Sequence, residues 1–419
     1  MEATRIRLAE GVHLTYLPAR KFKTSLLSAQ FVTPLRRETA GANALLAAVL
    51  RRGTVSCPDM GALSAKMDNL YDASIDYTVR KKGENQCVGF VASFIDDRYA
   101  PGGERLLEPA AALLGELVCD PVTYHGRFVP EYFESEKTNL LEAIRSLIND
   151  KRDWADSRLL RALCDGEAYA VPRLGDEETV DKLQALKVYT QYRDLISTAP
   201  LEIIYSGSAD LERVKQALAA AFATLPREEV RVISTAAPHV CRESVQHVED
   251  VLDVTQGKLG MGFSCGSDDV PALLMGNTLF GGSSNSKLFL NVREKLSLCY
   301  YASSLYHRQK GLITVSSGIE FQNYQRAYDE IMAQLEAVQK GELEDWELEG
   351  ARSTLLNSYA TVGDSQGKLE NFYLGQAATG QHETPADLAR AIQDMTAERI
   401  CRAMSTVKPV SYTHLTLPT

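Results

Sequence analysis

The feature that most constrains the fold of this chain is a weak internal repeat, whose period is about half of its 419 residues. Each half opens with alternating strand-like residues, at 12–34 and again at 245–265, and continues with an apolar helical segment, at 44–52 and 270–280. Further strands and long amphipathic helices follow in both halves. The repeat predicts two copies of one structural unit, and a chain of this length is too long for a single ordinary core.

Strands and long helices follow each other in unequal order within each half, which predicts an α+β fold rather than a regular βαβ array. We expect an N-terminal domain over residues 1–225 and a C-terminal domain over 244–409, joined by a linker at 226–243 that contains the run STAAPH. The two domains are expected to face each other across a cavity. The last residues, 410–419, show no helical or strand pattern and resemble a foreign translated sequence, so we expect the native chain to end near Pro409.

Charge and apolar patterning exclude several classes of function. A formal net charge of −10 argues against a nucleic-acid partner, which would need clustered Lys and Arg. We interpret the short basic run Arg80–Lys82 as a solvated turn or helix end, and the lining of a cavity is the alternative. No apolar run approaches the ~18 residues of a membrane span, and the first residues lack the order of a signal peptide. The eight cysteines are scattered, which indicates reduced thiols and a cytoplasmic protein.

Two short motifs invite catalytic interpretations that their surroundings do not support. GFSCG, at 262–266, matches the nucleophile-elbow pattern of serine hydrolases, but an elbow needs a helix that begins directly after the serine. Here we expect the helix to begin near Pro271, capped by one of residues 267–269, which leaves Ser264 in a strand. GGSSNSK, at 281–287, lacks the ending of a phosphate-binding loop, so we interpret it as a tight turn that enters a helix.

A resemblance to a known family rests on the stretch FGGSSNSKLFLNVREKLSLCYYASSLY, residues 280–306. Its Gly-rich turn, followed by S-K-L-F, R-E-K and Y, resembles the second-half signature of the M16 metallopeptidases, the group of insulin-degrading enzyme, pitrilysin and mitochondrial processing peptidase. The likeness covers nearly the whole chain. It is greatest to small bacterial members associated with the 5-aminopentanol modification of elongation factor P. The resemblance implies two tandem M16-like repeats of mixed sheet and helices.

Active members of this family carry the motif H-x-x-E-H on the first long helix, where two histidines bind Zn²⁺ and the Glu activates water. A third ligand, a Glu, stands in a later helix. In this sequence the positions of the two histidines, the base and the third ligand hold Ala44, Ala48, Ala47 and Ala143. The histidines elsewhere show no paired spacing typical of a metal site. The resemblance therefore implies a degenerate site, with no zinc or other cofactor, in a protein that is not an enzyme.

One functional pair of the family is retained. Two-subunit relatives use an Arg and a Tyr seven residues apart to hold the substrate backbone, and Arg293 and Tyr300 stand at that spacing. Guanidinium and phenol groups can both donate to a peptide carbonyl. Without the resemblance, Arg293 would be interpreted as a solvated helix residue and Tyr300 as a core residue.

The resemblance implies a non-catalytic subunit that pairs with a zinc-bearing M16 relative and contacts a peptide or protein segment, in the setting of elongation factor P modification. Neither a nucleic acid nor a membrane is expected as a partner. Two alternatives stay open: a stand-alone peptide-binding or structural scaffold, and an active zinc peptidase acting by itself.

Overall fold

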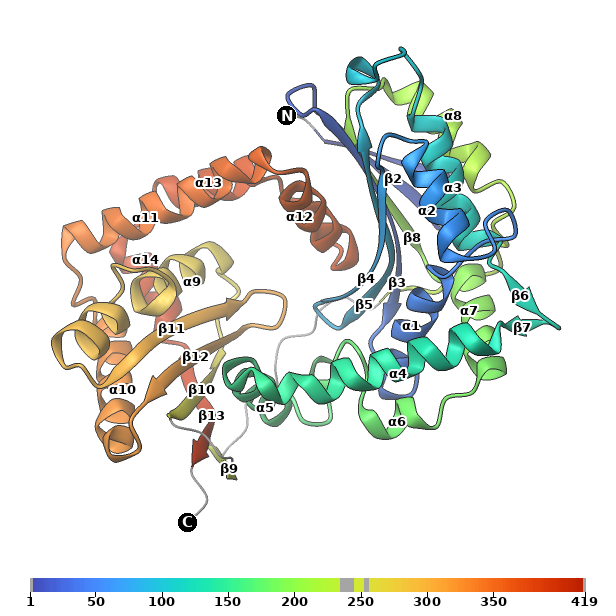
Figure 1. The fold of residues 1–419 in the computed structure, drawn as a ribbon. Coiled ribbons are helices and arrows are strands. Elements are labelled where there is room, and N and C mark those ends of the chain that lie inside the picture. The colour runs from blue at the N-terminus through green and yellow to red at the C-terminus, as the bar shows by residue number, and fades with distance from the viewer. Residues whose placement is uncertain (1–2, 234–244, 252–255, 417–419) are drawn as a thin grey trace. The chain divides into compact units, whose positions relative to one another are not determined.

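The computed structural model describes residues 3–233, 245–251 and 256–416 (Figure 1). The described residues form two compact units, each with its own mixed sheet and helices, which confirms the predicted α+β class. Unit 1 comprises the described residues of 1–145, 171–235 and 363–382, and unit 2 those of 146–170, 236–362 and 383–419. Two segments thus pack outside the continuous domains predicted from the sequence: 146–170 belongs to unit 2, and 363–382 belongs to unit 1.

Unit 1 is built on a six-stranded sheet. Its strands are β1 (Thr4–Ala9), β2 (Val12–Pro18), β3 (Thr24–Pro34), β4 (Ser74–Lys82), β5 (Asn85–Ile95) and β8 (Leu201–Gly207). They lie in the order β1-β2-β8-β3-β5-β4, so β4 is an edge strand, and only β2 and β8 run parallel. A separate short hairpin pairs β6 (Thr123–Tyr124) with β7 (Arg127–Phe128).

The helices of unit 1 cover both faces of this sheet. They are α1 (Arg37–Leu50), α2 (Met60–Asp68), α3 (Leu107–Cys119), α4 (Pro130–Ser146), α6 (Glu177–Asp181), α7 (Ala185–Thr198), α8 (Leu211–Ala221) and α12 (Gln366–Ala378). Helices α1, α3, α7 and α8 lie on one face and α12 lies on the other (Figure 1). The apolar core of the unit lies between the sheet and the first of these helix layers, where every residue of α1 from Ala40 to Leu50 is buried.

Unit 2 has a five-stranded sheet. Its strands are β9 (Gln246–Val251), β10 (Gly257–Cys265), β11 (Cys299–His307), β12 (Leu312–Ile319) and β13 (Val407–Thr416). The α-helices are α5 (Lys151–Leu163), α9 (Val270–Asn277), α10 (Tyr324–Lys340), α11 (Asp345–Ala360), α13 (Pro385–Gln393) and α14 (Ala397–Met404). Two π-helical segments are η4 (Thr278–Gly282) and η5 (Leu288–Lys295). Short 3-10 turns along the chain are η1 (Asp97–Tyr99), η2 (Leu147–Asn149), η3 (Ala168–Ala170), η6 (Phe321–Asn323) and η7 (Thr361–Asp364).

Five of the six strands in the unit 1 sheet have the same topology as the five strands of the unit 2 sheet. The order β2-β8-β3-β5-β4 in unit 1 matches β9-β13-β10-β12-β11 in unit 2, and in each the second strand runs parallel to the first. This agreement explains the repeat in the sequence. It also corrects the expectation that 410–419 has no strand character, because residues up to Thr416 belong to β13, between β9 and β10. Val410 is skipped in the pairing with β10, where Phe263 pairs with Pro409 and Gly262 with Ser411, so a bulge interrupts the alternation of faces along this strand. That the segment is foreign to the native chain stays a prediction.

Packing explains why 146–170 and 363–382 belong to units other than the predicted ones. Helix α5 lies against the glycine-rich strand β10, where a Cβ on Gly262 would stand only 2.4 Å from the methyl carbons of Leu163. Helix α12 lies on the polar face of the unit 1 sheet, where Gln366 donates to the carbonyl of Ser206 (2.7 Å) and Glu370 accepts from Ser28 (2.7 Å). Each helix therefore matches the particular sheet face that it covers.

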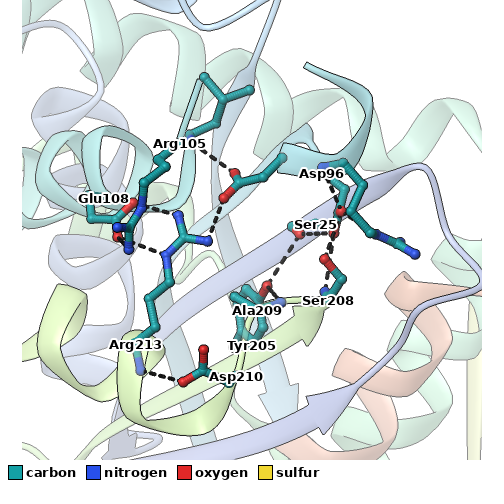
Figure 2. A network of polar contacts seen from close by, with 12 residues as sticks. Ser25, Asp96, Arg105, Glu108, Tyr205, Ser208, Ala209, Asp210 and Arg213 are labelled. Carbon is teal, nitrogen blue, oxygen red and sulfur yellow. Dashed lines mark hydrogen bonds and ion pairs between the residues drawn. The ribbon is translucent and has the colours of Figure 1, made fainter. Parts of the chain in front are cut away.

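A polar network ties the C-terminal end of β8 to α3 and α8 in unit 1 (Figure 2). Arg213 forms a bidentate ion pair with Glu108 at 2.8 and 2.7 Å, and this pairing lowers the pKa of Glu108 to about 2. Asp96 is buried, which by itself would raise its pKa, but hydrogen bonds from Arg98, Ser208 and Ser25 outweigh burial and hold that pKa below its usual value. All of these groups find partners within the network, so they stabilise the fold.

The linker predicted at 226–243 is only partly described. Its first residues pack on unit 1, where the backbone N–H of Glu228 donates to the carbonyl of Ser197 (2.9 Å), and residues 234–243 lie outside the described part of the chain. None of the helices in the described ranges is both long and apolar enough to cross a membrane. The seven cysteines in those ranges are free thiols.

Candidate functional site

The alanines that the sequence resemblance assigns to the zinc-ligand positions lie around one cavity in unit 1, which we call the unit 1 cavity. Its volume is ≈ 740 Å³, and Ala44 and Ala48 of α1 and Ala143 of α4 all line it. Residues four apart lie on the same side of a helix, which explains why Ala44 and Ala48 both reach the cavity. Ala47, at the position of the catalytic base, is fully buried and is not part of the lining. The structure therefore brings together three of the four positions that the sequence singles out.

One wall of the unit 1 cavity is the free edge of the sheet. Six consecutive residues of the edge strand β4, Tyr77–Lys82, line it. The backbone carbonyl of Val79 accepts a hydrogen bond from Nη1 of Arg173 (3.1 Å) and so points away from the neighbouring strand β5. Backbone groups of an antiparallel strand point alternately to its two sides. The N–H and C=O groups of Tyr77, Val79 and Lys81 are therefore directed to the free edge.

The position of Arg173 depends on a buried chain of amides. Gln86 donates to the carbonyl oxygens of Arg173 (2.6 Å) and of Ala40 in α1 (3.0 Å), and its own side-chain oxygen accepts from Asn43 (2.9 Å). Asn43 in turn accepts from Gln191 of α7 (3.0 Å). Because buried amides that lose a partner are costly, this chain holds the backbone of Arg173 at the edge of β4.

Positive side chains predominate in the lining of the unit 1 cavity. The cations are Arg80, Lys81, Lys82 and Arg173, and the carboxylate among the lining residues is Glu136. The interpretation of the basic run Arg80–Lys82 as a solvated turn or helix end is therefore wrong, and the alternative holds, because these residues end an edge strand and line a cavity.

Some of these charged side chains form ion pairs within the protein, and others form hydrogen bonds with uncharged groups. Arg80 is paired with Glu370 of α12 at 2.5 Å, and Glu136 is paired with Arg52 at 2.9 Å. Lys82 donates to the side-chain oxygen of Asn371 (2.6 Å), which is uncharged. Burial of Lys82 lowers the pKa of its ammonium group, and the nearby charge of Arg80 adds to this effect.

The predicted pair Arg293 and Tyr300 lies in unit 2, at a second hollow that we call the unit 2 cavity (≈ 400 Å³). Arg293 lies in the π-helical segment η5, its guanidinium 4.7 Å from the ring centre of Phe289. Tyr300 is the bulged residue at the start of the edge strand β11, and it is 63% exposed, so it is not a core residue. Ser297 between them has a positive φ of 50°, which is uncommon for this residue type. The two side chains line the same cavity.

The motifs that were set aside take structural roles. Ser264 lies within β10, and α9 begins at Val270 with Asp269 as its cap, where the backbone N–H of Ala272 donates to the Asp269 side chain (3.2 Å). The turn at 281–287 leads into the π-helical η5 rather than an α-helix. Within the ranges that the structure describes, no group of three or more His, Cys, Asp and Glu side chains could hold a metal ion.

Comparison with known proteins identifies the family. A family model described as "Peptidase M16 inactive domain" matches residues 182–355. A Bacillus subtilis protein described as "Probable inactive metalloprotease YmfF" is 34% identical over 400 residues, which cover 94% of this chain and 93% of that protein. This chain belongs to the M16 peptidase family. It is a non-catalytic member, in agreement with the inactive domain of the matching family model and with the probable inactive relative.

Solved structures share the M16 fold over the full length of the chain. A conserved protein from Enterococcus faecalis V583 has a TM-score of 0.90 at 26% identity and covers 100% of this chain and 99% of its own. A peptidase M16 inactive domain from Pseudomonas fluorescens has a TM-score of 0.80 with the same coverage, and its 18% identity speaks for the fold alone. The resemblance stated from the sequence is thereby confirmed at the level of family and fold.

Several residues of the unit 1 cavity were not recognised from the sequence. The edge strand Tyr77–Lys82, Arg173 and Asn371 come from distant parts of the chain and carry no motif. The signal that could have indicated the strand is the alternation in SIDYTV, residues 74–79, directly before the basic run. Nothing local to Arg173 or Asn371 points to a site.

Proposed function

We propose that this chain is the peptide-holding, non-catalytic subunit of an M16-type pair, in which a zinc-bearing relative supplies any metal chemistry. The observation that carries this proposal is the unit 1 cavity, where the degenerate ligand positions and the free edge of β4 line one space. An extended segment can add to such an edge through backbone hydrogen bonds, while its side chains enter neighbouring pockets. The cavity thus keeps a means of holding a peptide without a means of cleaving it.

The unit 2 cavity supports the same proposal from a second place. Arg293 and Tyr300 line it together, and Tyr300 presents its phenol to solvent at the bulged start of an edge strand. Both groups are hydrogen-bond donors suited to a peptide carbonyl. In the proposed pair they contact the peptide, and a partner chain provides the zinc. The cellular setting that we propose, elongation factor P modification, rests on the sequence resemblance alone, as does a cytoplasmic location.

Co-expression with a zinc-motif M16 relative tests the pairing. Light scattering of the purified product should give the mass of a one-to-one complex, and metal analysis should find zinc in the relative only. Each chain purified alone is the control. A protein that remains monomeric or associates only with itself in the presence of the relative would contradict the pairing and favour a stand-alone scaffold.

A further inference from the structure

The charge of the unit 1 cavity is opposite to that of the whole chain. The chain carries a formal net charge of −10, whereas four cations and one carboxylate line this cavity. The carboxylate, Glu136, is already paired with Arg52, and the cation Arg80 is already paired with Glu370. A local positive field within an acidic protein attracts a ligand of negative charge and repels one of positive charge.

Two of the cavity's cations contact neutral oxygen atoms. Nζ of Lys82 donates to Asn371, and Nη1 of Arg173 donates to the backbone carbonyl of Val79. Hydrogen bonds from a guanidinium or ammonium group to a carboxylate are about twice as strong as those between neutral groups. Both cations would therefore gain by exchanging their present partner for a carboxylate of a bound ligand.

Arg173 also blocks part of the β4 edge, with which an added strand would form backbone hydrogen bonds. Its hydrogen bond covers the Val79 carbonyl, which lies between the outward-directed backbone groups of Tyr77 and Lys81. Covering an edge with a charged side chain is one way in which proteins prevent unwanted strand pairing. A segment that adds to β4 must release Arg173 from Val79, and the released guanidinium then needs a new acceptor.

We infer that the unit 1 cavity binds an extended peptide segment rich in carboxylates, which pairs with β4. As it pairs, one of its carboxylates replaces the Val79 carbonyl as the hydrogen-bond acceptor of Arg173. This inference rests on the proposed peptide-holding function and names the chemical class of its ligand. The six lining residues of β4 span roughly 20 Å of extended chain. That length accommodates a segment with acidic side chains at alternate positions, which would point to the same side of the strand.

Matched peptides test the inference on the full-length chain. The probes are a fluorescein-labelled ten-residue peptide in which Glu alternates with Thr, and a twin in which Gln replaces every Glu. Fluorescence anisotropy at low salt should show the Glu peptide binding roughly ten-fold more tightly than the Gln twin, a preference that added salt should reduce. Arg173→Gln and Lys82→Gln should each lower the preference to about three-fold, and the double variant should remove it.

A control variant, and the binding of the Gln twin by Arg173→Gln, add two further checks. Lys187→Gln removes the same charge from an exposed position on α7 and should leave the preference unchanged. Arg173→Gln should leave binding of the Gln twin as tight as before or tighter, because the Val79 carbonyl is no longer covered by a charged group. Equal binding of both peptides to the unaltered chain would overturn the inference and leave peptide binding itself in place. Failure of both peptides to bind would overturn both the inference and the peptide-holding function.

Discussion

Arg52 donates a hydrogen bond of 2.9 Å to Glu136, and this pair joins the end of α1 to the wall of α4 that lines the unit 1 cavity. The second carboxylate oxygen of Glu136 accepts from Asn139 (3.2 Å), and the Arg52 guanidinium lies over the ring of Tyr132, 5.0 Å from its centre. The carboxylate that lines the cavity beside the degenerate ligand positions is thus neutralised by a protein cation.

Removing this cation should destabilise unit 1. Glu136 is only 9% exposed, so Arg52→Ala leaves a nearly buried carboxylate without its charged partner. We expect the free energy of unfolding to fall by about 2 kcal/mol, measured by urea denaturation with circular dichroism. The double variant Arg52→Ala with Glu136→Gln removes both charges and should recover part of the loss. An unfolding midpoint for Arg52→Ala equal to that of the unaltered protein would contradict this role.

Replacing the three cavity-lining alanines, Ala44, Ala48 and Ala143, by zinc ligands should create a metal site, because all three line the unit 1 cavity. The variant Ala44→His, Ala48→His and Ala143→Glu should retain about one zinc ion per chain after dialysis, because two histidines on one helix and a facing carboxylate form a complete ligand set. Metal analysis provides the measurement, and Ala143→Glu alone is the control that should retain none. No peptidase activity is expected, since Ala47 still replaces the base. A folded triple variant without zinc would show that the positions do not converge.

Arg293 and Tyr300 should act on ligand binding and leave folding unchanged. Tyr300 is exposed and Arg293 is half-buried at the unit 2 cavity, so Tyr300→Phe should leave the unfolding midpoint unaltered and Arg293→Ala should change it little. In the assembled complex each variant should weaken peptide binding by about three- to ten-fold, the value of one lost hydrogen bond. Isothermal titration with the peptide that the complex binds provides the measurement, and Lys295→Gln is the control, because Lys295 is exposed on the same segment η5 and does not line the cavity. A complex whose affinity is unaffected by either change would remove the pair from the binding role.

The ion pair between Glu108 and Arg213 should make unit 1 more resistant to acid. Arg213 lowers the pKa of Glu108 to about 2, below the ~4.3 of an unfolded glutamate. The stabilisation is therefore fully present above the unfolded value and is lost as the pH falls toward about 2. Glu108→Gln should cost about 1 kcal/mol at pH 6, after allowance for solvent screening, and clearly less at pH 3. Urea denaturation at the two pH values measures the difference, and a cost that is constant with pH would contradict it.

The packing of α5 on β10 predicts a position that tolerates only glycine. A Cβ on Gly262 would stand 2.4 Å from the Leu163 methyl carbons, so Gly262→Ala should lower the free energy of unfolding by about 1–3 kcal/mol. Gly266→Ala is the matched control, because its Cβ would meet its nearest neighbour, on Thr406, at an ordinary 3.4 Å. Adding Leu163→Ala to Gly262→Ala should relieve the clash. Equal thermal stability of the two glycine variants would show that α5 does not pack closely on this strand.

The repeat was accessible from the sequence because each unit is built from the same series of strands and helices. The exchange of 146–170 and 363–382 between the units could not be predicted from the sequence. Helices α5 and α12 have ordinary amphipathic or polar sequences, and the sheet that each one covers depends on the residues of the facing strands. Strand β13 was missed for a related reason. A bulge at Val410 interrupts the alternation of its faces, and its pairing with β9 and β10 is what makes it a strand.

The sequence by itself indicated the family and the α+β fold class, and it predicted a degenerate zinc site, because metal ligation depends on residue identity at set spacings. Only the tertiary structure decided that a basic run and Arg173, whose sequence separation from Val79 is 94 residues, meet at the free edge of β4 beside the alanines. The direction of an edge carbonyl and the partner of each charge depend on long-range packing, which no local pattern of residues specifies.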